Sequence, residues 1–135
     1  MSRGKTAAVL VAMTMAACGG DATSSAQGGA SGAPGPSGIP SNTRLADLTD
    51  TQIRQLCDWA AAQEGGYGTA HTCGGGITIR TYASQDDCFQ RTRASAGPTC
   101  AATVGDIEAC EQVLASDACN TSAPECANLI ACHAP

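Results

Sequence analysis

The apolar residues in the middle of the chain recur at helical spacing. One set falls at i, i+3, i+4 and i+7 and so shares a helix face: Ile53, Leu56, Cys57 and Ala60. Thr49 and Gln52 precede this set in the arrangement of a capping box, in which each side chain accepts a hydrogen bond from the other residue's backbone N–H. The pattern predicts a helix that begins at Thr49 and ends at Gly65-Gly66.

Three further capping pairs predict three more helices: Ser84 with Asp87, Thr103 with Asp106, and Ser122 with Glu125. Pro124 supports the last of them, because proline is favoured in the first turn of a helix. The residues expected to lie inward on these helices are Cys88 and Phe89, then Ile107, Cys110, Val113 and Leu114, and finally Cys126, Leu129 and Ile130.

A glycine-rich segment separates the first two predicted helices. Residues 65–76 contain six glycines, and residues 77–82 then alternate with the period of a strand. Residues 67–72 can pair with that strand across the glycines, and Tyr82 is expected in the core beside Phe89. The predicted fold class is mainly α: a small disulfide-stapled bundle of about four short helices with at most one short β-hairpin.

Cysteines supply the stability that the apolar residues cannot. Residues 44–135 contain only thirteen Leu, Ile, Val and Phe residues in 92, a low proportion for a folded domain. They also contain eight of the nine cysteines, which we expect to form four disulfides: Cys57, Cys73, Cys88, Cys100, Cys110, Cys119, Cys126 and Cys132. Eight cysteines allow about 105 pairings, and the spacing selects none of them.

The N-terminus has the features of an export signal. Arg3 and Lys5 precede an apolar stretch over residues 6–15 that is too short to span a bilayer. Residues 15–18, Met-Ala-Ala-Cys, resemble the lipobox of bacterial lipoproteins. The resemblance implies a signal peptide over residues 1–17, and cleavage before a Cys18 that carries a diacylglyceryl group and an N-acyl chain such as palmitate.

The same resemblance implies a location in the cell envelope. Asp directly after the lipidated cysteine is the usual inner-membrane signal, and Gly19 in its place favours anchoring to the outer membrane. The alternative is ordinary cleavage after Gly19, which gives a secreted soluble protein. Residues 18–43 are rich in Gly, Ser, Ala and Pro, and we expect a disordered tether there, followed by a folded domain over residues 44–135.

Composition excludes several classes of function. The net charge is −5 and aromatic residues make up 3% of the chain, so a nucleic-acid partner is not expected. Close Cys pairs for zinc are missing, and His71 and His133 are the two histidines, so we expect neither a metal nor another cofactor. The sequence contains no Gly-x-Ser-x-Gly elbow and no phosphate loop, which argues against an enzyme.

The leading hypothesis is a tethered domain with a structural or protein-binding role. Trp59 and Tyr67 are the candidate contact patch, because aromatic side chains concentrate binding energy. The first alternative is an inhibitor or small-ligand binder that presents the loop over residues 65–76. The second is a small hydrolase, which would need a cleft where Asp86, Glu108 and Glu111 converge.

Overall fold

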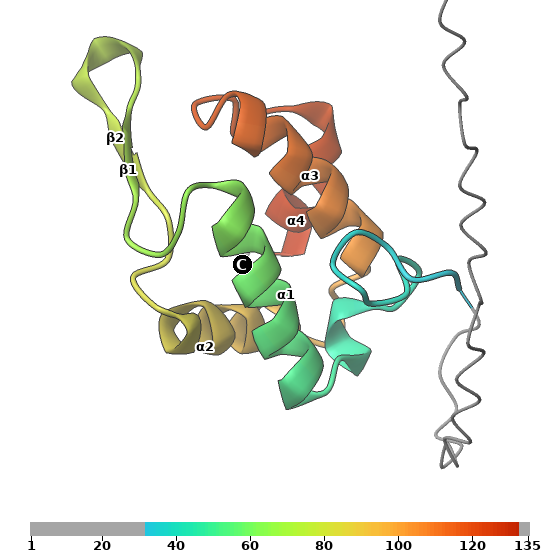
Figure 1. Cartoon of the computed structure of the whole chain (residues 1–135). Coiled ribbons are helices and arrows are strands. Elements are labelled where there is room, and N and C mark those ends of the chain that lie inside the picture. Colours follow the sequence, from blue (N-terminus) through green and yellow to red (C-terminus); the bar gives the residue numbers. More distant parts are fainter. Residues whose placement is uncertain (1–31, 133–135) are drawn as a thin grey trace, which may run out of the picture.

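The computed structural model describes residues 32–132, and within them it confirms a mainly α, disulfide-rich domain (Figure 1). The four α-helices are α1 (Asp50–Gln63), α2 (Gln85–Ser95), α3 (Val104–Ser116) and α4 (Ala127–Cys132). The strands β1 (Ala70–Thr72) and β2 (Thr78–Arg80) form one antiparallel hairpin. Three short 3-10 turns complete the described elements: η1 (Leu45–Asp47), η2 (Gly74–Gly76) and η3 (Pro124–Cys126).

The first three helices begin at the predicted capping residues. Thr49 and Thr103 each form a complete capping box, and the Ser84 side chain accepts a hydrogen bond from the backbone of Asp87. The predicted cap at Ser122 is wrong, because Ala123 is the residue that precedes the first turn. Pro124 holds the residue before it in an extended conformation, so the turn begins one residue later, as η3, and continues into α4.

All eight predicted cysteines form disulfides, and their pairing is now defined. The bridges are Cys57–Cys88, Cys73–Cys119, Cys100–Cys132 and Cys110–Cys126. They close sequence separations of 31, 46, 32 and 16 residues. Loops of these lengths correspond to about 3–4 kcal/mol of stabilisation per bridge if the effect is on the unfolded chain.

The core is small and lies between α1, α2 and the N-terminal half of α3. Ile39, Ile53 and Val104 are the largest fully buried side chains. Phe89 packs at the edge of this core, where the guanidinium of Arg54 lies 4.5 Å from the centre of its ring. The predictions of core positions for Tyr82 and Ile130 are wrong. Tyr82 follows the hairpin and is 38% exposed, and Ile130 on α4 is 55% exposed.

The prediction of a disordered tether up to Thr43 is wrong for the described part of that segment. Residues 34 and 40 form a bridge, and Ile39 is buried in the main core at 2% exposure. The backbone of the segment also bonds to the start of α3, where Val104 and Gly105 donate to the carbonyls of Thr43 and Ser41. The folded domain therefore includes residues before 44, while Cys18 and the rest of the predicted tether lie outside the described residues.

A buried carboxylate holds this segment in place. Glu108 on α3 is 4% exposed and accepts hydrogen bonds from the backbone and hydroxyl of Ser37, at 2.9 and 2.7 Å, and from the hydroxyl of Ser41, at 2.8 Å. Gly35 allows this close approach, because a Cβ there would lie 2.2 Å from a carboxylate oxygen of Glu108. Although its composition is typical of a disordered segment, the loop around Ser37 and Ser41 is ordered by its hydrogen bonds to Glu108.

Four disulfides place the domain outside the reducing cytoplasm, in an extracellular or envelope compartment. Among residues 32–132, none of the helices is long and apolar enough to cross a membrane.

We expect Glu108→Ala to release the segment over residues 34–41 and to lower the free energy of unfolding by about 3 kcal/mol. The substitution leaves three donors without their acceptor, two of them on a buried residue. Hydrogen exchange at the Ser37 amide should accelerate while amides inside α1 stay protected. Glu125→Ala, at an exposed position in η3, is the matched control. Unchanged exchange at Ser37 would show that the burial of Ile39 and the other hydrogen bonds of the segment hold it without Glu108.

Candidate functional site

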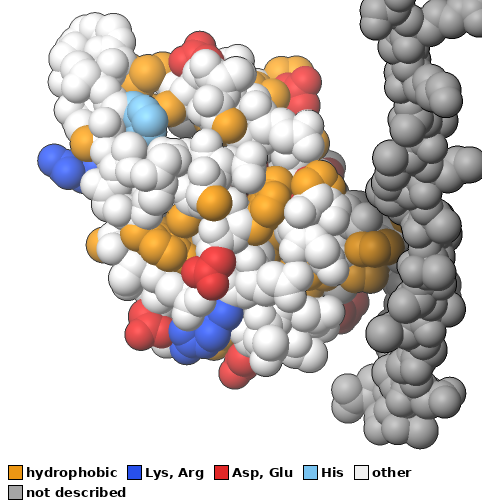
Figure 2. Space-filling model, in the orientation of Figure 1, with side chains coloured by type: hydrophobic (Ala, Val, Ile, Leu, Met, Phe, Trp, Pro, Cys, Tyr) orange, Lys and Arg blue, Asp and Glu red, His pale blue; other side chains and the backbone are white. Residues whose placement is uncertain are grey.

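The hairpin is the most prominent feature of the surface. Figure 1 shows β1 and β2 as an arm that extends from the helical body, and Figure 2 shows it as a projecting lobe. His71 pairs with Ile79 at the centre of the two strands. The tip turns through Gly75 and Gly76 at φ of 76° and 80°, a conformation that favours glycine. Ile77 follows this turn and is 64% exposed.

Hydrogen bonds and a disulfide hold the arm at several points along its length. Near its base, the backbone of Gly68 donates to Tyr82 at 2.8 Å, and the hydroxyls of Thr69 and Thr81 both donate to the carbonyl of Gly66 at 2.9 Å. Just before the tip, Cys73 bonds to Cys119, in the connection between α3 and η3. The glycine-rich segment is therefore an ordered hairpin with an attachment to the body close to its tip.

The predicted contact residues Trp59 and Tyr67 lie outside the two strands, Trp59 in α1 and Tyr67 before β1. Both side chains are half-buried and pack against the main core. The hydroxyl of Tyr67 donates to Asp58 at 2.8 Å, and burial together with this bond raises the pKa of Tyr67. Contact with a partner stays a prediction for this pair, while the hairpin beside them is far more exposed.

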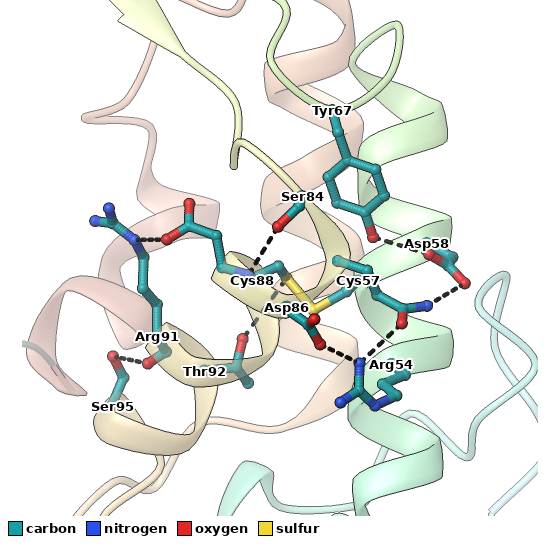
Figure 3. Close-up of a disulfide and its surroundings, with 12 residues drawn as sticks. Arg54, Cys57, Asp58, Tyr67, Ser84, Asp86, Cys88, Arg91, Thr92 and Ser95 are labelled. Atoms are coloured by element: carbon teal, nitrogen blue, oxygen red, sulfur yellow. Dashed lines mark hydrogen bonds and ion pairs between the residues drawn. A yellow bond between two sulfur atoms is a disulfide. The ribbon is translucent and has the colours of Figure 1, made fainter.

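Figure 3 shows why Tyr67 has a structural role. The Cys57–Cys88 bridge joins α1 to α2, and polar contacts surround it. Arg54 pairs with Asp86 at 2.6 Å, and Gln85 donates to Asp58 at 2.7 Å. Tyr67 completes this network through Asp58, which ties the loop after α1 to the α1–α2 pair.

A second feature is an apolar cavity between α1, α2, α3 and α4. Its volume is about 90 Å³, and its apolar wall consists of Leu45, Leu56, Ala60, Ile107, Leu129 and the Cys57–Cys88 bridge. Tyr82 and Glu111 also line it, and the same two residues line a wider, more polar depression that includes Glu64 and Arg91. Glu111 therefore stands at the boundary between a small apolar cavity and an open polar groove.

Glu111 has an environment that is unfavourable for a charged carboxylate. Its Oε2 atom is fully buried and has no hydrogen-bond partner among the described residues. Burial raises the pKa of Glu111 to about 8, and the negative charge of Glu64 contributes to the increase. Burial also raises the pKa of Glu64, partly offset by His71. For Tyr82, burial and then the charge of Glu111 raise the pKa of the hydroxyl.

Sequence reasoning missed this group. From the sequence, Glu111 was only one of three carboxylates that a hydrolase would need, and His71 had no assigned role. In the structure, His71 is half-buried in β1 and its Nε2 atom has no partner among the described residues. The spacing held a signal, because Val104, Ile107, Glu108 and Glu111 fall at i, i+3, i+4 and i+7 on one helix face.

The three carboxylates considered for a hydrolase contact different groups. Asp86 pairs with Arg54 at the surface, Glu108 binds Ser37 and Ser41, and Glu111 lies beside Glu64. This arrangement gives no support to a paired-carboxylate site. Cys126 and Cys132, the two cysteines closest in the sequence, are both in disulfides, so neither has a thiolate for a metal ion. Across residues 32–132, no group of three or more His, Cys, Asp or Glu side chains is placed to hold a metal ion.

Comparison with protein-family models, with curated proteins and with solved structures finds no match to this chain. The functional argument therefore depends on the geometry of the hairpin and of the Glu111 cavity.

The stability of the protein should decrease as pH rises from about 4.5 to about 8, because Glu111 ionises near 4.5 when unfolded and near 8 when folded. In that window the unfolded chain binds fewer protons, so deprotonation favours unfolding. We expect this loss in the free energy of unfolding to be on the order of 2–4 kcal/mol and to be absent in Glu111→Gln. Guanidinium unfolding of the oxidised proteins at pH 4 and pH 8.5 measures the loss.

The two proteins should have similar stability at pH 4, where Glu111 is neutral in both states, and the variant should be the more stable at pH 8.5. Glu125→Gln, at an exposed site, should follow the original protein at both values. Parallel curves for Glu111→Gln and the original protein would contradict the raised pKa.

Proposed function

We propose that the protein is a non-enzymatic, lipid-anchored domain of the cell envelope that binds a protein partner through the β1–β2 hairpin. The observation that carries the proposal is the position of the hairpin relative to the start of the described chain. In Figure 1 the arm and the segment over residues 32–44 lie at opposite sides of the helical body. A domain attached to a membrane through Cys18 would present this arm away from the anchor.

The construction of the arm also supports binding. Each strand has one neighbour, so each has an outer edge whose backbone groups are not used by the ladder. Such edges accept an added strand from a partner, with affinity from main-chain hydrogen bonds. The Cys73–Cys119 bridge and the threonine contacts at the base fix the arm before binding, which lowers the entropy lost on association.

The proposed lipid anchor gives a role to Cys18, the one cysteine of the sequence that is not among the eight paired in the domain. Eight cysteines are paired in the domain, which leaves Cys18, in its lipobox-like context, as the remaining thiol. Several acyl chains at one residue give stable membrane attachment, where a single chain is marginal. Outer-membrane anchoring is part of this proposal, on the basis of Gly19 in place of a retention Asp.

We expect intact-mass analysis of the protein from the membrane fraction to show a chain that begins at Cys18 and carries a diacylglyceryl group and an N-acyl chain. Eight cysteines should react with an alkylating reagent after reduction and none before it. Cys18→Ser should abolish the lipid increment and leave the four bridges intact. A soluble, unlipidated product from the original chain would instead establish the secreted alternative.

A photo-crosslinking residue at position 77 tests the hairpin. Ile77 is 64% exposed at the tip, and Ile130 on α4 is a matched control, since it is also an isoleucine and is 55% exposed. We expect a discrete crosslinked protein from position 77 in intact cells and none from position 130. The yield at 77 should decrease several-fold in the Cys73→Ser/Cys119→Ser variant. The same products from both positions, or none from position 77, would contradict hairpin binding.

A further inference from the structure

The Glu111 cavity is separate from the hairpin tip and from the anchor, and nothing in the proposed function uses it. It combines an apolar interior with a carboxyl group whose Oε2 atom is buried without a partner among the described residues. A buried polar atom without a hydrogen bond is costly to a fold and is an expected feature of a ligand site. A ligand that suits both parts of the cavity needs an apolar group and a polar or charged group that can pair with a carboxyl.

The interior sets the size of the ligand. At about 90 Å³ it is smaller than a cavity of about 150 Å³ that accepts benzene, so it takes an alkyl group on the order of four carbons. Its wall of leucine, isoleucine, alanine and disulfide sulfur offers contacts to such a group. A longer chain would have to extend into the groove beyond Glu111.

The mouth sets the charge of the ligand. Glu111 and Glu64 are close enough for their charges to repel, and a cation between the cavity and the groove would stabilise both carboxylates. The arginines that line the groove do not fill this position, and His71, whose charge acts on Glu64, is not among the residues that line the cavity or the groove. Arg91 is paired with Asp87 at 2.9 Å, and Arg80 is an exposed residue of β2. Tyr82 lines both spaces, so its phenol ring is available to a cation at the boundary.

We propose that this cavity binds a short alkyl primary amine, with the alkyl group inside and the ammonium group at the mouth, beside the Glu111 side chain that lines both the cavity and the groove. As the ammonium ion binds, Glu111 releases its proton to the solvent, and the resulting carboxylate pairs with the ammonium group. Neutral molecules of the same shape fill the interior but leave the carboxyl without a charged partner. Carboxylate ligands bring a negative charge close to Glu64 and give the Glu111 carboxyl no cationic partner.

Titration of the exported protein, with its disulfides intact, tests this site with n-butylamine as the probe. Methyl NMR signals of Leu56, Ile107 and Leu129 should shift and saturate at pH 7.5. The apparent Kd for n-butylamine should be at least tenfold lower than for 1-butanol, and butyrate should give no saturable shift. Glu111→Gln should weaken n-butylamine binding at least tenfold, Glu64→Gln less, and the exposed control Glu125→Gln not at all.

Three results would overturn the assignment. The first is equal affinity for n-butylamine and 1-butanol, which would make the cavity a purely apolar site. The second is unchanged amine binding by Glu111→Gln, a variant that we expect to fold at least as stably as the original. The third is the absence of any saturable shift up to about 50 mM amine, a limit that corresponds to negligible affinity.

Discussion

The fold depends on covalent cross-links, because the chain has too few apolar side chains to build a conventional core. Five of the fifteen buried apolar residues among those described are disulfide cysteines. The bridges join α1 to α2, the hairpin to the connection after α3, the α2–α3 connection to the end of α4, and α3 to η3. Each described helix is therefore tied to another part of the chain, and an oxidising compartment is a condition of the fold.

Helix α3 carries two acidic side chains on the face that it turns toward the small core. Val104 and Ile107 face the main core, and Glu108 and Glu111 share that face. Cys110, Val113 and Leu114 pack in the second cluster, with Cys126 of η3. Glu108 has three hydrogen bonds, and Glu111 has a raised pKa and an oxygen without a partner. One acidic side chain organises a loop, and the other reduces stability at neutral pH. A side chain such as Glu111, which destabilises the fold and makes no compensating hydrogen bond through its Oε2 atom, is typical of functional sites.

The local structure could be predicted from the sequence because its determinants are local. The threonine and serine caps of α1, α2 and α3, the alternating strand and the glycine turn all depend on residues within a few positions of one another. The segment over residues 34–43 could not be predicted in this way. Its order depends on Glu108, 71 positions after Ser37, and composition does not encode a contact at that separation. The disulfide pairing and the proximity of Glu111 to Glu64 are long-range properties of the same kind, although the helical spacing of Glu111 on α3 is a local one.

The two candidate sites lie on one structural path. Tyr82 accepts the hydrogen bond from Gly68 that closes the base of the hairpin, and the same residue lines the cavity beside Glu111. His71, in the centre of β1, acts electrostatically on Glu64, which in turn acts on Glu111. A ligand that places a positive charge at Glu111 would therefore change the electrostatic environment at the base of the arm. Tyr82 therefore connects the hairpin that we propose as a binding surface to the cavity that we propose as an amine site.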